Sequence, residues 1–116
     1  MLEKNGYVFN VGICYESCQS EHWQTLKPAG ILLCPVAKDQ AGMVRSKRHW
    51  IEIAAEKQSL MLICNATGNL EGFHASGGSM VIAPSGEVRY QAGICSALII
   101  LDLVSGEPLE TRCIRQ

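Results

Sequence analysis

Residues 31–66, ILLCPVAKDQAGMVRSKRHWIEIAAEKQSLMLICNA, decide the fold class. The segment opens on a wholly apolar run, Ile31 to Cys34, which Pro35 closes, and it ends on a second apolar run, Leu60 to Ala66. Such runs are typical of strands buried on both faces of a sheet. Between them, Val44 to Gln58 places its apolar residues mostly on one side, at a period of about 3.6 residues. The segment therefore predicts a strand, a helix and a second strand in a right-handed parallel crossover.

The residues before this segment predict the same alternation of strand and helix. Tyr7 to Cys14 (YVFNVGIC) is rich in β-branched and aromatic residues, which favours a strand. Ser20 to Lys27 reads as a short helix, with Ser20 as its N-cap and Glu21 in its first turn. Pro28 and Gly30 would end that helix.

The residues after this segment predict strands alone. Ser79 to Ala83 and Val88 to Gln91 would form a hairpin, because the residues between them have turn composition. Ser96 to Leu103 (SALIILDL) is the last strong strand, and 104–116 is a polar tail without a clear period. We therefore expect one domain over 1–116, an α/β fold with one mixed sheet and two helices on one face. The other sheet face is also apolar, so we expect something outside this chain to bury it.

The composition excludes several classes of protein. The chain has 116 residues, of which 47% are hydrophobic and 18% charged, with a net charge of −1. These values argue against a disordered chain and against a basic nucleic-acid binder. No apolar run approaches the ~20 residues that span a bilayer, and 1–6 shows no apolar signal core. We therefore expect no membrane contact, a cytoplasmic location, and thiols at all six cysteines. These are Cys14, Cys18, Cys34, Cys64, Cys95 and Cys113.

The segment Gly12-Ile13-Cys14-Tyr15-Glu16 is the strongest candidate for chemistry. Cys14 stands where a buried strand stops and the chain turns towards a helix. A thiol there is held by the sheet and exposed by the turn, and the carboxyl ends of strands are where α/β sheets bind ligands. The alternative is that Cys14 is only the last packed residue of its strand.

Motifs along most of the chain resemble the C-terminal part of the nitrilase, or carbon–nitrogen hydrolase, superfamily. The resemblance runs from about Tyr7 to Leu103 and lies in the order and spacing of the motifs. The motifs are Val11 to Glu16 (the nucleophile segment), Glu21, Ile31 to Pro35, His49-Trp50, Ala54 to Glu56, Asn65 to Gly68, and Gly78 to Val88. The family's complete fold is a four-layer αββα sandwich, so this chain resembles half of one.

The resemblance implies that Cys14 is a nucleophile. In this family a cysteine thiolate attacks an amide or nitrile carbon, a Glu acts as general base, and a Lys stabilises the intermediate. The backbone amide of Tyr15 would face the developing oxyanion. The family's Glu and Lys precede the nucleophile, and no residue before Cys14 matches those motifs. Auxiliary candidates within the chain are Glu16, Glu21 and Lys38, and candidates for the substrate pocket are His49, Trp50, Asn65 and His74.

The sequence therefore leaves two hypotheses about function. The first is a carbon–nitrogen hydrolase domain that uses Cys14, needs no cofactor, and receives its remaining catalytic groups from a missing N-terminal half or a partner. The second is a non-catalytic module of the same fold that dimerises or binds a small molecule. For either function, we expect a homodimer through the apolar sheet face as the simplest cover for that face.

Other patterns give weaker hypotheses. Cys14, Cys18 and His22 recur every fourth residue and could offer ligands to zinc on a continuous helix, but Cys14 is expected at a strand end. Cys14 and Cys18 could also form a reversible disulfide. The basic residues from Arg45 to His49 read as the solvated start of a helix or as a site for an anionic partner.

Overall fold

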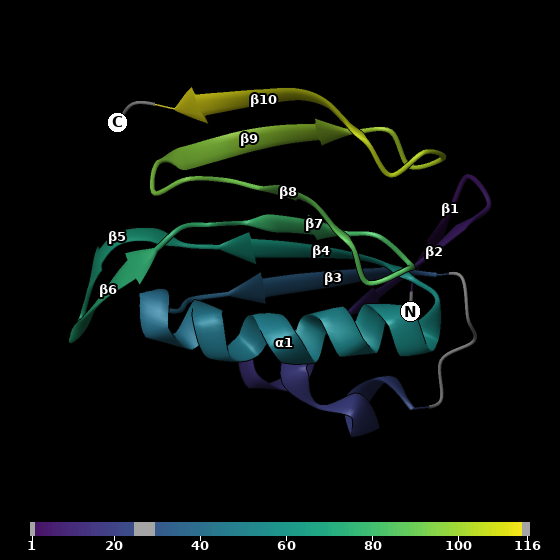
Figure 1. The fold of residues 1–116 in the computed structure, drawn as a ribbon, viewed down its shortest axis with the longest axis horizontal. Helices are drawn as coiled ribbons and strands as arrows, with labels where there is room; N and C mark the ends of the chain where they lie inside the picture. Colours follow the sequence, from purple (N-terminus) through teal and green to yellow (C-terminus); the bar gives the residue numbers. More distant parts are fainter. Residues whose placement is uncertain (1, 25–29, 115–116) are drawn as a thin grey trace.

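The computed structural model describes residues 2–24 and 30–114, which form a six-stranded mixed sheet with helical segments on one side (Figure 1). The sheet order is β1-β2-β3-β4-β7-β8. Its strands are β1 (Leu2–Lys4), β2 (Tyr7–Val11), β3 (Ile31–Val36), β4 (Leu60–Asn65), β7 (Met80–Ile82) and β8 (Val88–Gln91). The remaining elements are η1 (Cys14–Cys18), η2 (Ser20–Trp23), α1 (Gln40–Lys57), β5 (Thr67–Leu70), β6 (Phe73–Ser76), β9 (Ser96–Leu101) and β10 (Pro108–Ile114).

The centre of the sheet is parallel, as the apolar runs predict. β2 pairs with β3 and β3 with β4 in parallel, and the register places Val11 opposite Leu33 and Leu33 opposite Leu62. β4 with β7 and β7 with β8 are antiparallel, which confirms the predicted hairpin at the edge. Because β2, β3 and β4 run the same way, the residues that follow them lie along one edge of the sheet.

The helix α1 covers one face of this sheet. Its N-cap is Asp39, whose side chain accepts a hydrogen bond from the Gly42 amide at 2.7 Å. The cap starts the helix four residues before the predicted Val44, because a capping carboxylate satisfies an otherwise free amide in the first turn. The buried face of α1 packs on β3, β4 and β7 around a core that includes Leu32, Trp50 and Met61.

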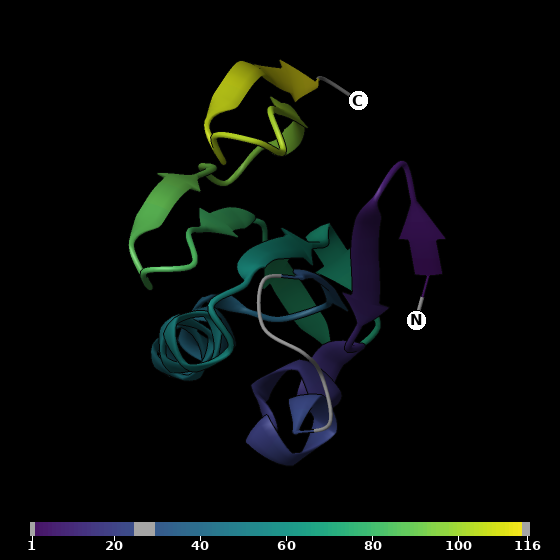
Figure 2. The same cartoon turned by 90° about the vertical axis from the view of Figure 1, so that its right-hand side faces the viewer.

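The second predicted helix takes a different form. Ser20 to Lys27 is expected as one helix, yet its described part forms the short 3₁₀ helix η2, and residues 25–27 lie outside the described residues. A further 3₁₀ helix, η1, precedes it and begins at Cys14, which was expected to end the strand. Both lie on the same side of the sheet as α1 (Figure 2). The tight turns wrap around the side chains of Ser17 and Trp23, which are both fully buried. The helical layer is thus on one face, as predicted, but only α1 is α-helical within the described residues.

Two segments expected to be irregular are strands. The predicted polar tail, 104–116, contains β10, which pairs antiparallel with β9. The loop around His74 is the hairpin of β5 and β6, with Thr67 opposite Ser76. A disulfide joins Cys95 to Cys113, so the expectation of six free thiols is wrong for this pair.

The second sheet face is covered in part by this chain itself. Figure 2 shows the β9–β10 hairpin above the face opposite α1. Ile99, Leu101 and Leu103 pack against a second apolar cluster built on Ile31 and Leu60. A cavity of about 510 Å³ remains between the hairpin and the sheet. The expectation that only an outside partner buries this face is therefore corrected, although the cover is incomplete. Within the described residues, no helix is long and apolar enough to cross a membrane.

Candidate functional site

Cys14 occupies a sharp turn directly after β2. The Gly12 amide donates to the Leu33 carbonyl at 2.9 Å, which continues the parallel pairing to the last residues before the turn. Cys14 then adopts a φ of +51°, a left-handed conformation that residues with a Cβ rarely take. Such positions are costly and collect at functional sites, where the surrounding structure enforces them. The Cys14 side chain is half-buried, and its thiol is free.

A buried hydroxyl network enforces this turn. Ser17 Oγ donates to the Cys14 carbonyl at 2.6 Å and accepts from Trp50 Nε1 at 3.0 Å. Trp23 Nε1 donates to the Ser17 carbonyl at 3.2 Å. Neither tryptophan is exposed to solvent. Two indole groups, one from α1 and one from η2, thus fix the backbone that carries the thiol, because each satisfies a polar atom that has no access to water.

Glu16 is engaged within the same turn. Its Oε1 accepts from the Ile13 amide at 3.1 Å, and its Oε2 lies 3.9 Å from His22 Nδ1. His22 Nε2 is 2.9 Å from the Val11 carbonyl, so this imidazole also ties η2 to the end of β2. The first hydrogen bond of η1 runs from the Glu16 amide to the Ile13 carbonyl. The Tyr15 amide precedes that bond, at the start of the helical turn, where amides lack an intrahelical partner.

Lys38 and Asn65 lie on the sheet edge that carries Cys14. Asn65 is buried, and its Oδ1 accepts from the Lys38 amide at 2.9 Å. Its Nδ2 donates to the carbonyls of Lys38 and Gly77 at 3.0 and 2.8 Å. Asn65 therefore joins the loops that follow β3 and β6, and it holds the Lys38 backbone at the strand end next to the Cys14 turn.

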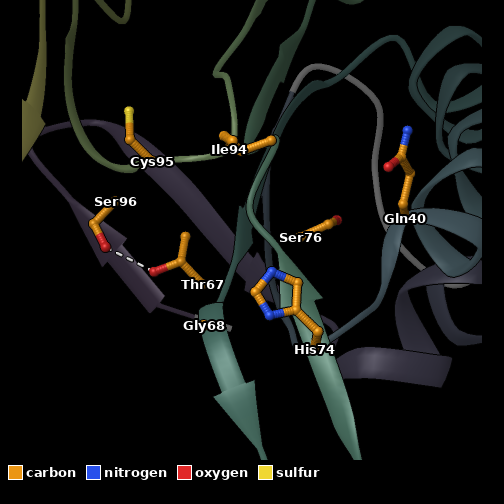
Figure 3. Close-up of a pocket in the computed structure, with 8 residues that line it drawn as sticks. All are labelled: Gln40, Thr67, Gly68, His74, Ser76, Ile94, Cys95 and Ser96. Atoms are coloured by element: carbon orange, nitrogen blue, oxygen red, sulfur yellow. Dashed lines mark hydrogen bonds between the residues drawn. The ribbon is translucent and has the colours of Figure 1, made fainter.

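The other predicted residues lie elsewhere. Glu21 is exposed in η2, and His49 is exposed on α1 while its neighbour Trp50 points into the core. His74 is exposed on β6, with its Nδ1 2.8 Å from Asn69 Oδ1. It lines a separate cavity of about 450 Å³, with residues from α1, β5 and the start of β9 (Figure 3). Cys14 does not line this cavity, so the structure divides the predicted pocket residues between two places.

The remaining thiols differ in environment. Burial, with a smaller contribution from Cys18, raises the pKa of Cys34 to about 12, which keeps this thiol protonated. Cys14 and Cys18 are not joined to each other. No cluster of His, Cys, Asp or Glu in the described part of the chain could hold a metal ion, which weighs against the zinc hypothesis.

Sequence reasoning missed two residues of the site, Ser17 and Trp23. Their position after Cys14 is visible in the sequence, but the hydrogen bond between Ser17 and Trp50 joins residues 33 positions apart. Only the presence of two tryptophans in a short chain could have signalled buried indole N–H groups that need partners.

Comparisons with known proteins find likeness in structure only. No protein-family profile matches the chain, and neither does any curated protein. The crystal structure of Nit3 from Saccharomyces cerevisiae, of branch 10 of the nitrilase superfamily, aligns at 26% identity with a TM-score of 0.62. That alignment covers 74% of this chain and 33% of Nit3. An amidase from Nesterenkonia sp. AN1, solved with acrylamide added to its active-site cysteine, aligns at 19% identity with a TM-score of 0.69. It covers 95% of this chain and 39% of the amidase, so the chain spans less than half the length of either protein.

Proposed function

Because this chain has the nitrilase-superfamily fold that its motifs predict, we propose that Cys14 is the nucleophile of a carbon–nitrogen hydrolase site for amides or nitriles. The observation that carries the proposal is the left-handed turn at Cys14, which the Ser17 and Trp50 side chains hold at the carboxyl end of β2. A buried network that maintains a costly conformation at a free thiol is the arrangement expected of an oriented nucleophile.

The proposed reaction begins with attack of the Cys14 thiolate on the amide carbon. The new C–S bond forms as the carbonyl electron pair moves to oxygen, and the Tyr15 amide donates to that oxyanion. The C–N bond then breaks, the amine leaves after it takes up a proton, and water hydrolyses the thioester. For a nitrile, attack on the nitrile carbon gives a thioimidate, a first water molecule converts it to the thioester with release of ammonia, and a second hydrolyses the thioester.

The general base and the cation are proposed to come from outside the described residues. Glu16 accepts from the Ile13 amide and faces His22, so its carboxylate is engaged within its own turn. Lys38 follows β3, the strand next to β2, but among the described residues its ammonium group makes no hydrogen bond or ion pair with the Cys14 turn. A missing N-terminal half or a partner that supplies a Glu and a Lys would complete the site. Since acid–base assistance is typically worth ~10²–10⁴-fold, the chain by itself would be a poor hydrolase.

Alkylation of Cys14 tests this proposal. We expect iodoacetamide to label Cys14 about tenfold faster than Cys64 at neutral pH, because an oriented thiol at the start of a helical turn is more reactive than an ordinary exposed one. Peptide mass spectrometry after timed labelling reports both sites in one sample, so Cys64 is an internal control. Cys14→Ser should remove the fast site and leave Cys64 unchanged. Equal labelling of the two thiols would contradict an assembled nucleophile.

A second function, a non-catalytic dimerising module, is favoured by the incompletely covered sheet face. Val11 and Leu98 are about half exposed, and both line the apolar cavity beneath the hairpin. We propose that a second copy of this chain packs there. Light scattering at micromolar concentration should then give twice the chain mass, and Leu98→Glu should give a monomer, with Val104→Glu, an exposed residue outside the cavity lining, as control. A monomeric parent chain would exclude this function.

The proposed location is the cytoplasm. Cys14, Cys18, Cys34 and Cys64 are free, which suits a reducing compartment. In such a compartment a disulfide like Cys95–Cys113 is usually transient.

A further inference from the structure

The β9–β10 hairpin forms a roof over the apolar cavity. Ile99 and Leu101 of β9 face the sheet, and with Ala97 and Leu98 they close one side of the cavity. The lining residues carry no charge. If the roof opened, the cavity and the apolar sheet face beneath it would be exposed to solvent.

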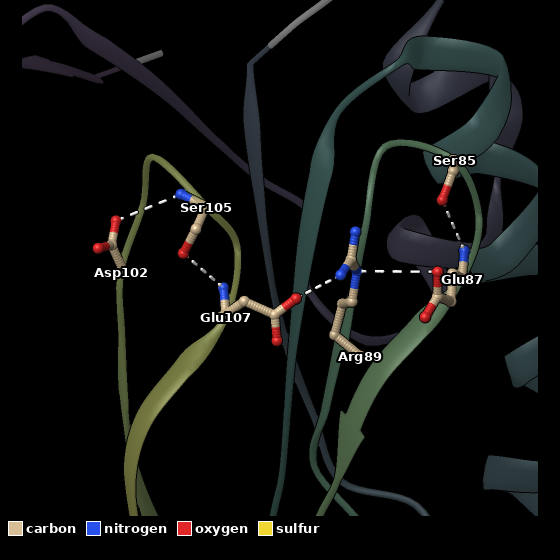
Figure 4. Close-up of polar contacts among 6 residues, drawn as sticks. All are labelled: Ser85, Glu87, Arg89, Asp102, Ser105 and Glu107. Carbon is tan, nitrogen blue, oxygen red and sulfur yellow. Dashed lines mark hydrogen bonds and ion pairs between the residues drawn. The ribbon is translucent and has the colours of Figure 1, made fainter.

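Besides the apolar packing of Ile99, Leu101 and Leu103, few polar contacts among the described residues hold this roof in place. Arg89 of β8 forms ion pairs with Glu107, beside the hairpin turn, and with Glu87 (Figure 4). Within the turn, the Ser105 amide donates a hydrogen bond to Asp102 Oδ1. Exposed ion pairs of this kind contribute little to stability. At the other end of the hairpin, Thr67 Oγ1 lies 2.7 Å from Ser96 Oγ. In the part of the chain that the structure describes, β9 pairs only with β10, and a lone two-stranded ribbon is marginally stable.

The disulfide closes the open end of the hairpin. Cys95 directly precedes β9, and Cys113 lies in β10 opposite Ala97, so the bond encloses both strands in one loop. Cys113 is exposed and Cys95 is half-buried. β10 meets the rest of the described chain mainly through β9, so the bond is the one covalent tie that holds its far end in place.

We propose that Cys95–Cys113 is a redox-sensitive latch that holds the β9–β10 hairpin closed over the apolar cavity. A dithiol reductant opens it in two steps. A thiolate of the reductant attacks the exposed Cys113 sulfur, and Cys95 leaves as a thiolate that takes up a proton from water. The second thiol of the reductant then attacks the mixed disulfide and releases Cys113, so two electrons pass to the protein and the reductant becomes a cyclic disulfide.

Reduction removes the constraint on the separation of the two strands. The disulfide spans 18 residues, and a loop of that size gains substantially from cross-linking in the chain-entropy account. Without the disulfide, β10 separates from β9 more often. β9 then has no neighbouring strand to hydrogen-bond with. The apolar face is therefore more accessible in the reduced protein than in the oxidised one, where the hairpin covers part of it.

Two measurements on the whole chain, with and without dithiothreitol, test the latch. Hydrogen exchange should become about 100-fold faster at amides of β9 and β10 after reduction, while amides of β3 and β4 keep their rates. Nile red, an uncharged dye whose emission rises in apolar surroundings, should bind the reduced protein severalfold more than the oxidised one. Intact mass confirms that the bond has been reduced.

Two variants separate the latch from other effects of the reductant. Cys95→Ser/Cys113→Ser should show fast exchange in β9 and β10 without reductant and no further change with it. Cys18→Ser removes a free thiol that does not line the cavity, and it should respond to reductant as the parent does. Unchanged β9–β10 exchange after complete reduction would overturn the latch. A rise in dye binding or in β3–β4 exchange in the double variant on adding dithiothreitol would overturn it as well, since the reductant would then act elsewhere.

Discussion

Gly12→Ala is expected to destabilise the fold by about 3 kcal/mol, at the upper end of the usual cost of overpacking. A Cβ at position 12 would lie 2.6 Å from Cη2 of Trp23, and closer still to Cζ2 of the same ring. The ring cannot retreat, because Trp23 is fully buried and its Nε1 is bonded to the Ser17 carbonyl. The Gly12 backbone is held from the other side by its bond to the Leu33 carbonyl.

Chemical denaturation followed by circular dichroism measures this loss. Gly93→Ala is the matched control, because a Cβ there meets nothing within 4 Å, and its cost should stay within about 0.5 kcal/mol. Trp23→Phe removes the part of the ring that the new methyl group meets. We therefore expect Trp23→Phe to lower stability less in the Gly12→Ala background than it does in the parent chain. Additive effects of the two substitutions would show that the clash is not the cause.

The parallel core of the sheet could be predicted from local pattern, because its strands are buried on both faces. Ile31 to Cys34 and Leu60 to Cys64 are unbroken apolar runs, which favour buried strands, and the helix between them has a clear period. The helix start was misplaced because a cap depends on one side chain, Asp39, that gives no periodic signal.

The hairpins around His74 and Cys113 could not be predicted in the same way. Both β6 and β10 are largely exposed, so neither needs alternating apolar residues, and β10 is defined by its pairing with β9 and by a disulfide. Pairing between distant segments is a tertiary property that local composition does not report.

The position of the proposed nucleophile can be predicted from the sequence, but the side chains that support it cannot. Cys14 stands out because it ends a strand, which is a local feature. The left-handed conformation there is imposed by Ser17 and the two indoles, whose contacts depend on how α1 and η2 pack together. The resemblance led to Cys14 and Trp50 separately, and the structure adds that Trp50 acts below the turn rather than in a pocket.

Trp50→Ala is expected to cost about 4 kcal/mol, because it leaves a large cavity in the core and removes the donor to Ser17 Oγ. Trp50→Phe separates the two contributions. It keeps most of the packing but loses the indole N–H and a small part of the ring volume, so it should cost about 1–2 kcal/mol. Arg45→Ala, an exposed change on the same helix, should stay within about 0.5 kcal/mol.

Trp50→Phe also tests how the turn positions Cys14. Ser17 Oγ would keep its bond to the Cys14 carbonyl but lose the partner that holds the hydroxyl in place. We therefore expect the labelling rate of Cys14 to fall towards that of Cys64 under conditions where circular dichroism shows the variant to be folded. Stability measurements alone would not separate this role from packing, whereas the ratio of the two labelling rates does. An unchanged ratio in folded Trp50→Phe would show that the Cys14 turn holds its conformation without the indole, and the positioning role would then rest on Trp23 and the backbone of η1.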